Sequence, residues 1–308
     1  MTLDSDRYQG CLQGLAAGDA LGTTAEFKAP GTFEPLEDIV GGGVFGLQPG
    51  QWTDDTSMAL CLADSLLTAP GFDPADQMRR YVRWFREGYL SSTGECFDIG
   101  NATRSALLQF EASGEAYSGS EDPRSAGNGP IMRLAPVVMY YAEDPAAAIE
   151  YASRSSRTTH AAAECVDACR LMAAYILAGL HGWSKQELLA PDAFGGWLEE
   201  DTLSRSILDI KRGSYKLKAP PEIKGSGYVV QSLEAALWAF HGSSSFAEGA
   251  LLAVNLGDDA DTTGAVYGQI AGAYYGLGGI PAHWSGRLAM RALISDYAGR
   301  LFAERAGR

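Results

Sequence analysis

The sequence predicts an all-α fold, a single compact domain of many helices that spans residues 1–308. Apolar residues recur mostly at spacings of three and four residues, which is typical of amphipathic helices and not of strands. Short segments rich in Gly and Pro separate these stretches, and none is long enough to link two domains. With 46% hydrophobic residues, the chain can also bury one substantial core.

The periodic stretches define the predicted helices in chain order. Turn-forming clusters at residues 41–43, 127–130 and 220–221 lie between them. Residues 183–227 are the least regular, and their mixture of tryptophans, acids and bases favours solvated loop and surface helix over a rim that contacts another protein. The predicted helices cover residues 10–22, 55–68, 75–88, 101–111, 131–142, 146–154, 160–180, 229–241, 246–254 and 262–277.

Glycine occupies every fourth position near both ends of the chain. Each interior glycine costs a helix about 1 kcal/mol relative to alanine, so the pattern needs a compensating role. Small residues on one face let two helix backbones approach closely, and we therefore expect these two helices to pack together. The glycines are Gly10, Gly14, Gly18 and Gly22 in the first segment and Gly264, Gly268, Gly272 and Gly276 in the last.

The charge of the chain argues against nucleic acid as a partner. The formal net charge is −14, whereas binding to a phosphate backbone requires clustered Lys and Arg. An acidic excess can also be local, because a site that collects carboxylates around divalent cations adds negative charge.

Cysteine usage and the N-terminal residues predict a cytoplasmic protein. The five cysteines form no CxxC pair and are odd in number, which fits neither a disulfide framework nor a zinc knuckle. Cys165 and Cys169 lie one helical turn apart, and buried core thiols are the favoured interpretation over a shared metal. The N-terminal residues carry acids where a secretion signal needs positive charge, and no apolar run reaches membrane-spanning length. We expect neither export nor insertion into a membrane.

The motif Thr53-Asp54-Asp55-Thr56 stands immediately before a predicted helix. Asp and Thr are favoured helix caps, and acids suit the positive end of the helix dipole, so capping alone could explain this motif.

A second acidic motif, residues 257–263 (GDDADTT), also opens a predicted helix. Five aspartates at two helix starts would repel strongly unless positive charge lay between them, and two divalent cations are the simplest solution. Carboxylate and hydroxyl oxygens, without histidine in either motif, favour Mg²⁺ or Mn²⁺. Each motif can offer one carboxylate to each of two ions about 3.5–4 Å apart. The spacing of a calcium-binding EF-hand loop is absent.

These motifs, with several others in the same order, resemble the ADP-ribosylglycohydrolase family, and most closely its dinitrogenase reductase-activating branch. Each motif alone is weak evidence, but their order and separations match over nearly the whole chain. The matching pieces are residues 14–26 (GLAAGDALGTTAE), 50–56 (GQWTDDT), 97–104 (FDIGNATR), 127–136 (GNGPIMRLAP), Thr159-His160, Tyr228 and 257–264 (GDDADTTG).

The resemblance implies an all-α orthogonal bundle that holds two Mg²⁺ or Mn²⁺ ions at the base of a cleft. The family often has glycine at the position of Asp258, so we align Asp259 with the ligand and interpret Asp258 as a helix cap or outer group. The metal ligands implied by the resemblance are Thr53, Asp54, Asp55, Asp259, Asp261 and Thr262.

Two carboxylates are implied to be catalytic, Asp98 and Glu26. Cleavage of a glycosidic bond develops positive charge on the ribose, so one carboxylate can stabilise it while another group handles the proton of water. From sequence alone, Asp98 could equally cap the helix that follows, and Glu26 could be an ordinary surface acid. The sequence does not decide which of the two is the general base.

The remaining motifs are implied to bind the nucleotide. Gly127, Asn128 and Gly129 form a predicted tight turn whose free N–H groups could cradle a diphosphate, with a plain capping turn as the alternative. His160 and Tyr228 could contact the nucleotide or could be structural. The resemblance adds Gly100, Asn101 and Met132 to the substrate contacts.

The resemblance implies an enzyme that removes ADP-ribose from protein arginine by hydrolysing the N-glycosidic bond. The expected partners are an ADP-ribosylated protein and free ADP-ribose, and the expected state is a monomer. Two alternatives remain open, namely another acceptor (serine, a nucleobase or a free ADP-ribose derivative) and a non-catalytic ADP-ribose-binding protein. The intact acidic motifs argue against the second alternative. Residues 122–125 depart from the nitrogenase-regulating branch, which leaves recognition of the target protein open.

Overall fold

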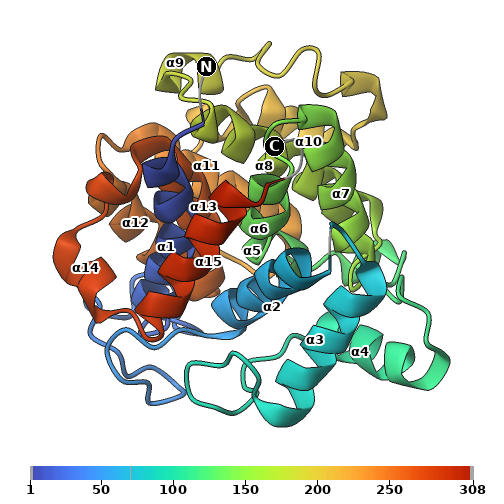
Figure 1. Ribbon diagram of the computed structural model, residues 1–308. Helices are drawn as coiled ribbons and strands as arrows, with labels where there is room; N and C mark the ends of the chain where they lie inside the picture. The colour runs from blue at the N-terminus through green and yellow to red at the C-terminus, as the bar shows by residue number, and fades with distance from the viewer. Residues whose placement is uncertain (1–2, 70, 306–308) are drawn as a thin grey trace.

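The computed structural model describes residues 3–69 and 71–305. The described residues form α-helices and short 3-10 turns, with isolated bridges in place of strands, so the all-α prediction is confirmed. Figure 1 shows the helices crossing at steep angles around a central pair, α1 and α13. The helices are α1 (Ser5–Gly22), α2 (Asp54–Thr68), α3 (Pro74–Glu87), α4 (Asn101–Ser113), α5 (Gly129–Met132), α6 (Ala135–Tyr140), α7 (Pro145–Arg157), α8 (Ala163–Leu180), α9 (Lys185–Leu188), α10 (Arg205–Lys211), α11 (Val229–Gly242), α12 (Phe246–Val254), α13 (Ala260–Tyr275), α14 (Ala282–Arg287) and α15 (Arg291–Ala303).

All ten predicted stretches overlap observed helices, and local signals explain several of the ends. Helix α3 begins after Asp73, whose carboxylate accepts from the backbone N–H groups of Ala75 and Asp76, and Pro74 occupies its first position. The helix ends at Gly88, which adopts a left-handed conformation with φ of 67°. These boundaries are encoded within a few residues of each end.

The stretch predicted as one helix over residues 131–142 is instead two short helices, α5 and α6. Pro136 cannot donate a backbone hydrogen bond, so the helical ladder is interrupted there. Gln269 of α13 compensates, because its Nε2 donates to the Met132 carbonyl at 2.7 Å and its Oε1 accepts from Ala135 N at 2.8 Å. A side chain from a distant segment therefore satisfies the polar groups that this break exposes.

Among the described residues, α14 and α15 were not predicted from the sequence, and α9 and α10 lie within residues 183–227, where loop and surface helix were predicted without bounds. Helix α15 begins after Met290, which has a left-handed φ of 52° and provides no side-chain cap. It packs against α1 and α2, and these tertiary contacts stabilise a segment whose start carries no capping signal.

The two glycine-striped helices, α1 and α13, pack against each other more extensively than any other pair in the described chain, as predicted. They run antiparallel, with Gly18 facing Gly264 and Gly14 facing Gly268. A Cβ atom added at either Gly18 or Gly264 would overlap the carbonyl oxygen of the other. Only glycine permits this approach, and it brings the end of α1 against the start of α13.

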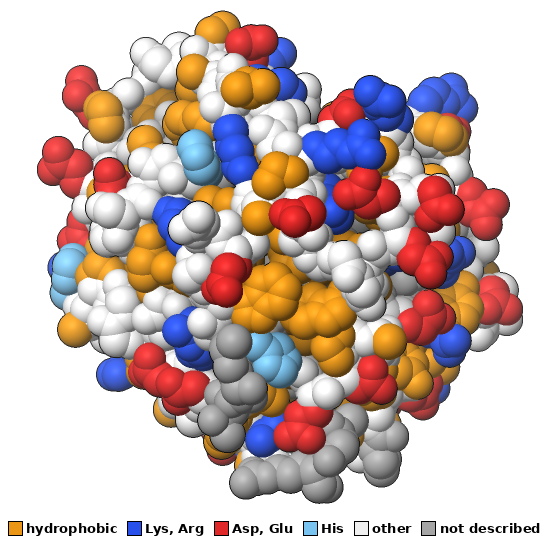
Figure 2. Space-filling model, turned by 90° about the horizontal axis from the view of Figure 1, so that it is seen from above, with side chains coloured by type: hydrophobic (Ala, Val, Ile, Leu, Met, Phe, Trp, Pro, Cys, Tyr) orange, Lys and Arg blue, Asp and Glu red, His pale blue; other side chains and the backbone are white. Residues whose placement is uncertain are grey.

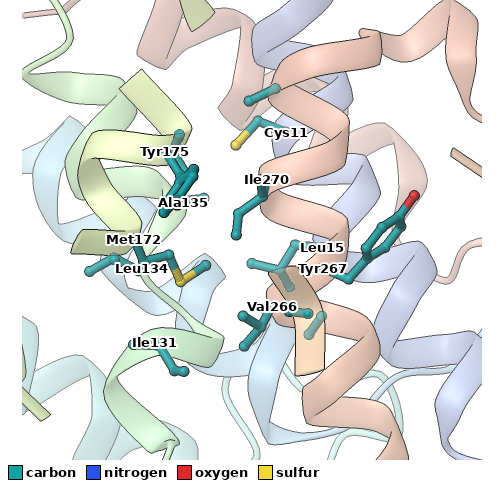
Figure 3. Packing of buried hydrophobic residues seen from close by; sticks show 14 of the residues in the cluster. Cys11, Leu15, Ile131, Leu134, Ala135, Met172, Tyr175, Val266, Tyr267 and Ile270 are labelled. Carbon is teal, nitrogen blue, oxygen red and sulfur yellow. The ribbon is translucent and has the colours of Figure 1, made fainter. Parts of the chain in front are cut away.

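Apolar side chains from α5, α6 and α8 pack on the other side of α13. Figure 3 shows Ile270 and Val266 of α13 pointing toward Ile131, Leu134 and Met172, all of which are buried. This core fixes α13 on both sides. It leaves the start of α13 in a defined position relative to α1 and α2.

The cysteines are unpaired, as predicted, and the hydropathy of the helices bears on membrane insertion. All five cysteines are unpaired thiols, and Cys165 and Cys169 are buried in the core. Within the described residues, no helix is both long enough and apolar enough to cross a membrane.

The irregular segment after α8 lies at the top of Figure 1 together with α9, whereas the loop between α1 and α2 lies at the bottom. Figure 2 looks onto that upper face, where acidic and basic side chains are interspersed around small apolar areas. The segment returns to the middle of the molecule at Gly225 and Gly227, which lie beside Asp259.

The glycine contact predicts a sharp difference between two Gly→Ala substitutions. Gly18→Ala should lower the free energy of unfolding by about 3 kcal/mol or more, because a methyl group would overlap backbone that cannot rotate away. Gly286→Ala in α14, where an added Cβ has nothing within 4 Å, should be neutral or stabilising by up to about 1 kcal/mol. Urea unfolding measures both, and equal effects of the two changes would contradict the proposed packing.

Candidate active site

The acidic motifs meet where the end of α1, the start of α2 and the start of α13 converge. Asp55 and Asp261 are fully buried, and Asp54 is nearly so. Glu26, just beyond α1, is only 2% exposed, so its interpretation as a surface acid is wrong. Carboxylates more than 200 residues apart in the sequence therefore share one buried site.

Carboxylate oxygens in this site form two groups that could hold a metal ion. Asp19, Asp55 and Asp261 each offer an oxygen within 4.8 Å of the others, and so do Glu26, Asp98 and Asp261. Asp261 belongs to both groups. This sharing is the arrangement expected of two neighbouring cation sites.

Asp19 was not assigned a role from the sequence, although it lies inside one of the family motifs. Its Oδ1 accepts from the backbone N–H and hydroxyl of Thr53 at 2.9 and 3.0 Å, and its Oδ2 accepts from those of Thr56 at 3.0 and 2.6 Å. These four bonds fill the acceptor capacity of a carboxylate, so we interpret Asp19 as a cap for α2 supplied from another helix. Asp55 and Asp261 are the members of this group that keep an unpartnered oxygen for a cation. The only feature of the sequence that could have indicated the capping role is the position of Asp19 in a glycine-striped helix.

The capping interpretation of Asp54 and Asp55 is not supported. Thr53 is the N-cap residue of α2 and makes no cap bond from its own side chain, because Asp19 satisfies the N–H groups. The two aspartates point instead into the acidic site.

The hydroxyl of Thr53 lies among three carboxylates. Its oxygen is 3.0 Å from Asp19, 3.2 Å from Asp55 and 3.1 Å from Asp261. A hydroxyl carries one hydrogen, so it can donate to only one of these anions. The remaining two carboxylates then face the hydroxyl oxygen without a hydrogen between them, and a cation nearby would offset this repulsion.

Three buried carboxylate oxygens have no hydrogen-bond partner: Glu26 Oε2, Asp55 Oδ1 and Asp261 Oδ1. An unpartnered buried polar atom costs about 1–3 kcal/mol, and more when it is charged. Divalent cations would satisfy all three atoms, and the all-oxygen set fits Mg²⁺ or Mn²⁺. The side chains present therefore fit the implied metal ions.

Burial and mutual repulsion raise the pKa values of these acids. Burial, followed by the neighbouring Asp98 charge, raises the pKa of Glu26 to about 10. Burial raises the pKa of Asp98 to about 7 and that of Asp19 to about 6, the latter opposed by the hydrogen bonds from Thr56 and Thr53. Burial also raises the pKa of Asp261 well above its usual range.

Asp259 and Asp258 have different environments. Asp259 occupies the N-cap position of α13, and its Oδ2 accepts from Asn128 Nδ2 at 2.8 Å. Asp258 adopts a left-handed φ of 52° and exchanges backbone hydrogen bonds with Phe27 and Lys28. Asp258 is therefore not the helix cap, and its conformation explains why glycine is also suited to that position.

A pocket of about 390 Å³ opens above the buried acids. Thr53, Asp55 and Asp261 lie beneath it and do not line it. The expected site residues that line it are Glu26, Asp54, Asp98, Gly100, Asn101, Gly127, Asn128, Gly129, Met132, His160, Asp259 and Thr262.

Asp98 stands in the pocket wall with a left-handed φ of 58°. The N-cap of α4 is Gly100, so Asp98 does not cap that helix. Non-glycine residues in this conformation store strain and are concentrated at functional sites.

The turn at residues 127–129 is held by other protein groups. Gly127 N donates to Ser125 O at 2.8 Å and Asn128 N donates to Gly227 O at 3.0 Å, so these two N–H groups are not free for a diphosphate. A Cβ at Gly129 would lie 2.7 Å from His160 Cε1, so any larger residue there would displace the His160 ring.

His160 is buried at the pocket wall, and burial, with the Arg133 charge, lowers its pKa to about 3. Its Nδ1 pairs with the Thr159 hydroxyl at 2.8 Å. The ring is therefore neutral at working pH.

Tyr228 lies outside this pocket. It lines a larger adjoining pocket of about 990 Å³, which shares Asn101, Gly127 and Gly227 with the inner one. The Tyr228 hydroxyl donates to Glu164 at 2.6 Å, and its side chain is exposed in the wall of this outer pocket.

Comparisons with known proteins identify the chain. A family model described as ADP-ribosylglycohydrolase matches residues 1–308. The ADP-ribosylarginine hydrolase Tri1 of Pseudomonas putida is 46% identical over 297 residues, covering 96% of this chain and 78% of that relative. The ADP-ribosyl-[dinitrogen reductase] glycohydrolase of Rhodospirillum rubrum is 31% identical, covering 93% of this chain and 91% of its own length.

A solved structure described as an ADP-ribosylglycohydrolase-related protein complex superposes with a TM-score of 0.86 at 46% identity, covering 97% of this chain and 98% of the other. The fold and the matched sequences define an enzyme of the glycohydrolase class. The chain belongs to the ADP-ribosylglycohydrolase family, as its motifs indicated.

The raised pKa values predict how stability depends on pH without metal. The folded acids bind protons that the unfolded chain releases near pH 4, so this stability is present below about pH 4 and is lost as the pH rises through about 7 for Asp98 and about 10 for Glu26. EDTA-treated protein should lose roughly 2 kcal/mol or more between pH 5.5 and 8.5. Mn²⁺ should remove most of this loss, as measured by thermal unfolding. A rise in stability with pH in EDTA would contradict the assignment.

Proposed function

We propose that this chain hydrolyses the N-glycosidic bond between ADP-ribose and a protein arginine side chain, with two Mg²⁺ or Mn²⁺ ions. The observation that carries the proposal is the similarity to a relative named ADP-ribosylarginine hydrolase, which is 46% identical across 96% of the chain. The carboxylates that could hold two metal ions are also present together in the site. Loss of aspartates from the two acidic motifs would favour a non-catalytic ADP-ribose-binding protein, but both motifs are intact.

The metal ligands in this proposal are the residues that converge at the three helix ends. Asp55 and Asp261 offer unpartnered buried oxygens, and Thr53, Asp54, Asp259 and Thr262 complete the set. When bound, the cations would align the ribose hydroxyls and supply a water that is nucleophilic near neutral pH.

Asp98 and Glu26 supply the acid–base chemistry. Both line the pocket directly above Asp261, so both can reach the ribose carbon at which the bond breaks. One carboxylate stabilises the positive charge that develops on the sugar, and the other accepts the proton of the attacking water. The bond between the ribose carbon and the guanidino nitrogen breaks with its electron pair passing to nitrogen. The arginine therefore leaves as a neutral guanidine, which then takes up the proton that the carboxylate accepted from water.

The nucleotide occupies the two connected pockets. The neutral ring of His160 and the side chain of Asn101 face the inner pocket, and the outer one ends at Tyr228. The inner pocket holds the ribose, and the diphosphate and adenosine extend past Gly127 toward Tyr228.

The direct test is release of ADP-ribose from a protein mono-ADP-ribosylated on arginine, measured by chromatography with Mg²⁺ or Mn²⁺ present. We expect turnover that EDTA abolishes and added metal restores. A parallel panel of serine-linked, nucleobase-linked and free ADP-ribose derivatives distinguishes the acceptor. Turnover of one of these derivatives without release from arginine would replace the arginine assignment.

Two matched substitutions separate metal binding from catalysis. Asp261→Asn should weaken Mn²⁺ binding at least tenfold, because Asp261 belongs to both carboxylate groups and carries an unpartnered oxygen. Asp98→Asn should lower kcat by about 10²-fold or more while Mn²⁺ affinity changes much less than in Asp261→Asn, because Asp98 belongs to only one of the two carboxylate groups. Isothermal titration calorimetry with Mn²⁺ reports both affinities. Equal loss of metal in the two variants would make Asp98 a ligand.

A further inference from the structure

Exposed phenylalanines gather at the mouth of the inner pocket. Phe27 is 66% exposed and Phe45 is 36% exposed, and Val44 beside Phe45 is also exposed. Phe97 is half-buried next to them. Other exposed large apolar side chains, such as Leu217, lie elsewhere in the described chain, so this concentration is a local feature.

The Phe45 ring contacts both other rings, although Phe27 and Phe45 lie in the connection between α1 and α2 and Phe97 lies in the connection between α3 and α4. The ring centroids of Phe27 and Phe45 are 6.5 Å apart, and those of Phe45 and Phe97 are 5.1 Å apart, both with edge-to-face geometry. We name Phe27, Phe45, Phe97 and the neighbouring Val44 the phenylalanine rim.

The backbone holds the rim in place. Phe27 has a left-handed φ of 58°, and its N–H donates to the carbonyl of Asp258 at 2.7 Å. The loop that presents Phe45 is closed by two backbone bonds between Gly42 and Leu47, at 2.7 and 2.9 Å. A Cβ at Gly43 would overlap the carbonyl of Thr23, so the loop packs directly on the end of α1. The rim is therefore a built surface and not a loose loop tip.

The rim stands next to the acids and away from the outer pocket. Phe27 follows Glu26 directly and lines the inner pocket, and Phe97 directly precedes Asp98. The outer pocket that ends at Tyr228 has no phenylalanine in its wall. A substrate whose nucleotide extends toward Tyr228 therefore has its other side, the modified protein, at the rim.

We propose that the phenylalanine rim binds the ADP-ribosylated protein, by contacting apolar side chains that flank the modified arginine. This inference rests on the proposed function. Apolar residues that flank the modified arginine, and the aliphatic part of the arginine itself, remove the exposed rings from water. The faces of the rings also attract the cationic guanidinium group above the acidic site. The rim thereby selects targets by the residues around the modified side chain.

The test uses two short peptides, each mono-ADP-ribosylated on one arginine, with leucine on both sides in one and serine on both sides in the other. The wild-type enzyme should show a KM about tenfold lower for the leucine peptide, equivalent to about 1.4 kcal/mol, with similar kcat. Phe45→Ala should remove this preference, and Phe45→Leu should retain part of it. Leu217→Ala, at a site 91% exposed and remote from the rim, is the control and should keep the full preference.

Three outcomes decide the proposal. A wild-type enzyme that hydrolyses both peptides equally well, or a Phe45→Ala variant that keeps the leucine preference, overturns the role of the rim and leaves the proposed function standing. Release of ADP-ribose from neither peptide refutes arginine hydrolysis, and the rim proposal fails with it. Thermal unfolding of each variant verifies that a lost preference is not a loss of fold.

Discussion

The structure depends on the close backbone contact between α1 and α13. Facing glycines let these helices approach until their backbones touch, at a position where any side chain would overlap a carbonyl. The contact joins the first helix to a helix in the last fifth of the chain, and it places the end of α1 beside the start of α13. Glu26 and Asp261, separated by most of the sequence, come together for this reason.

The same convergence concentrates negative charge that the fold alone does not neutralise. Asp19 is compensated by four hydrogen bonds from the start of α2, which makes it part of the framework. Asp55 and Asp261 retain oxygens without partners, and burial raises the pKa values of their carboxyl groups. These carboxylates therefore lower the free energy of unfolding of the metal-free protein at a place that is suited to cations. Such local destabilisation is common at functional sites.

The pocket above the acids has two different sides. Toward Tyr228 it widens into the outer pocket of about 990 Å³. Toward Phe27 and Phe45 it ends in exposed rings. In the function that we propose, one of these surfaces contacts the ADP-ribose and the other contacts the protein that carries it.

The sequence by itself determined the helices whose caps and apolar spacing lie within a few residues, as in α3, and the acidic motifs at two helix starts. It also carried the glycine pattern that joins α1 to α13. Only the tertiary structure decided that Asp19 caps α2, that Glu26 is buried, that Gln269 spans the break between α5 and α6, and that α15 is a helix at all. The physical reason is range. Capping and helical periodicity are local, whereas burial, charge repulsion and a cap supplied from another helix depend on segments that meet only when the chain has folded.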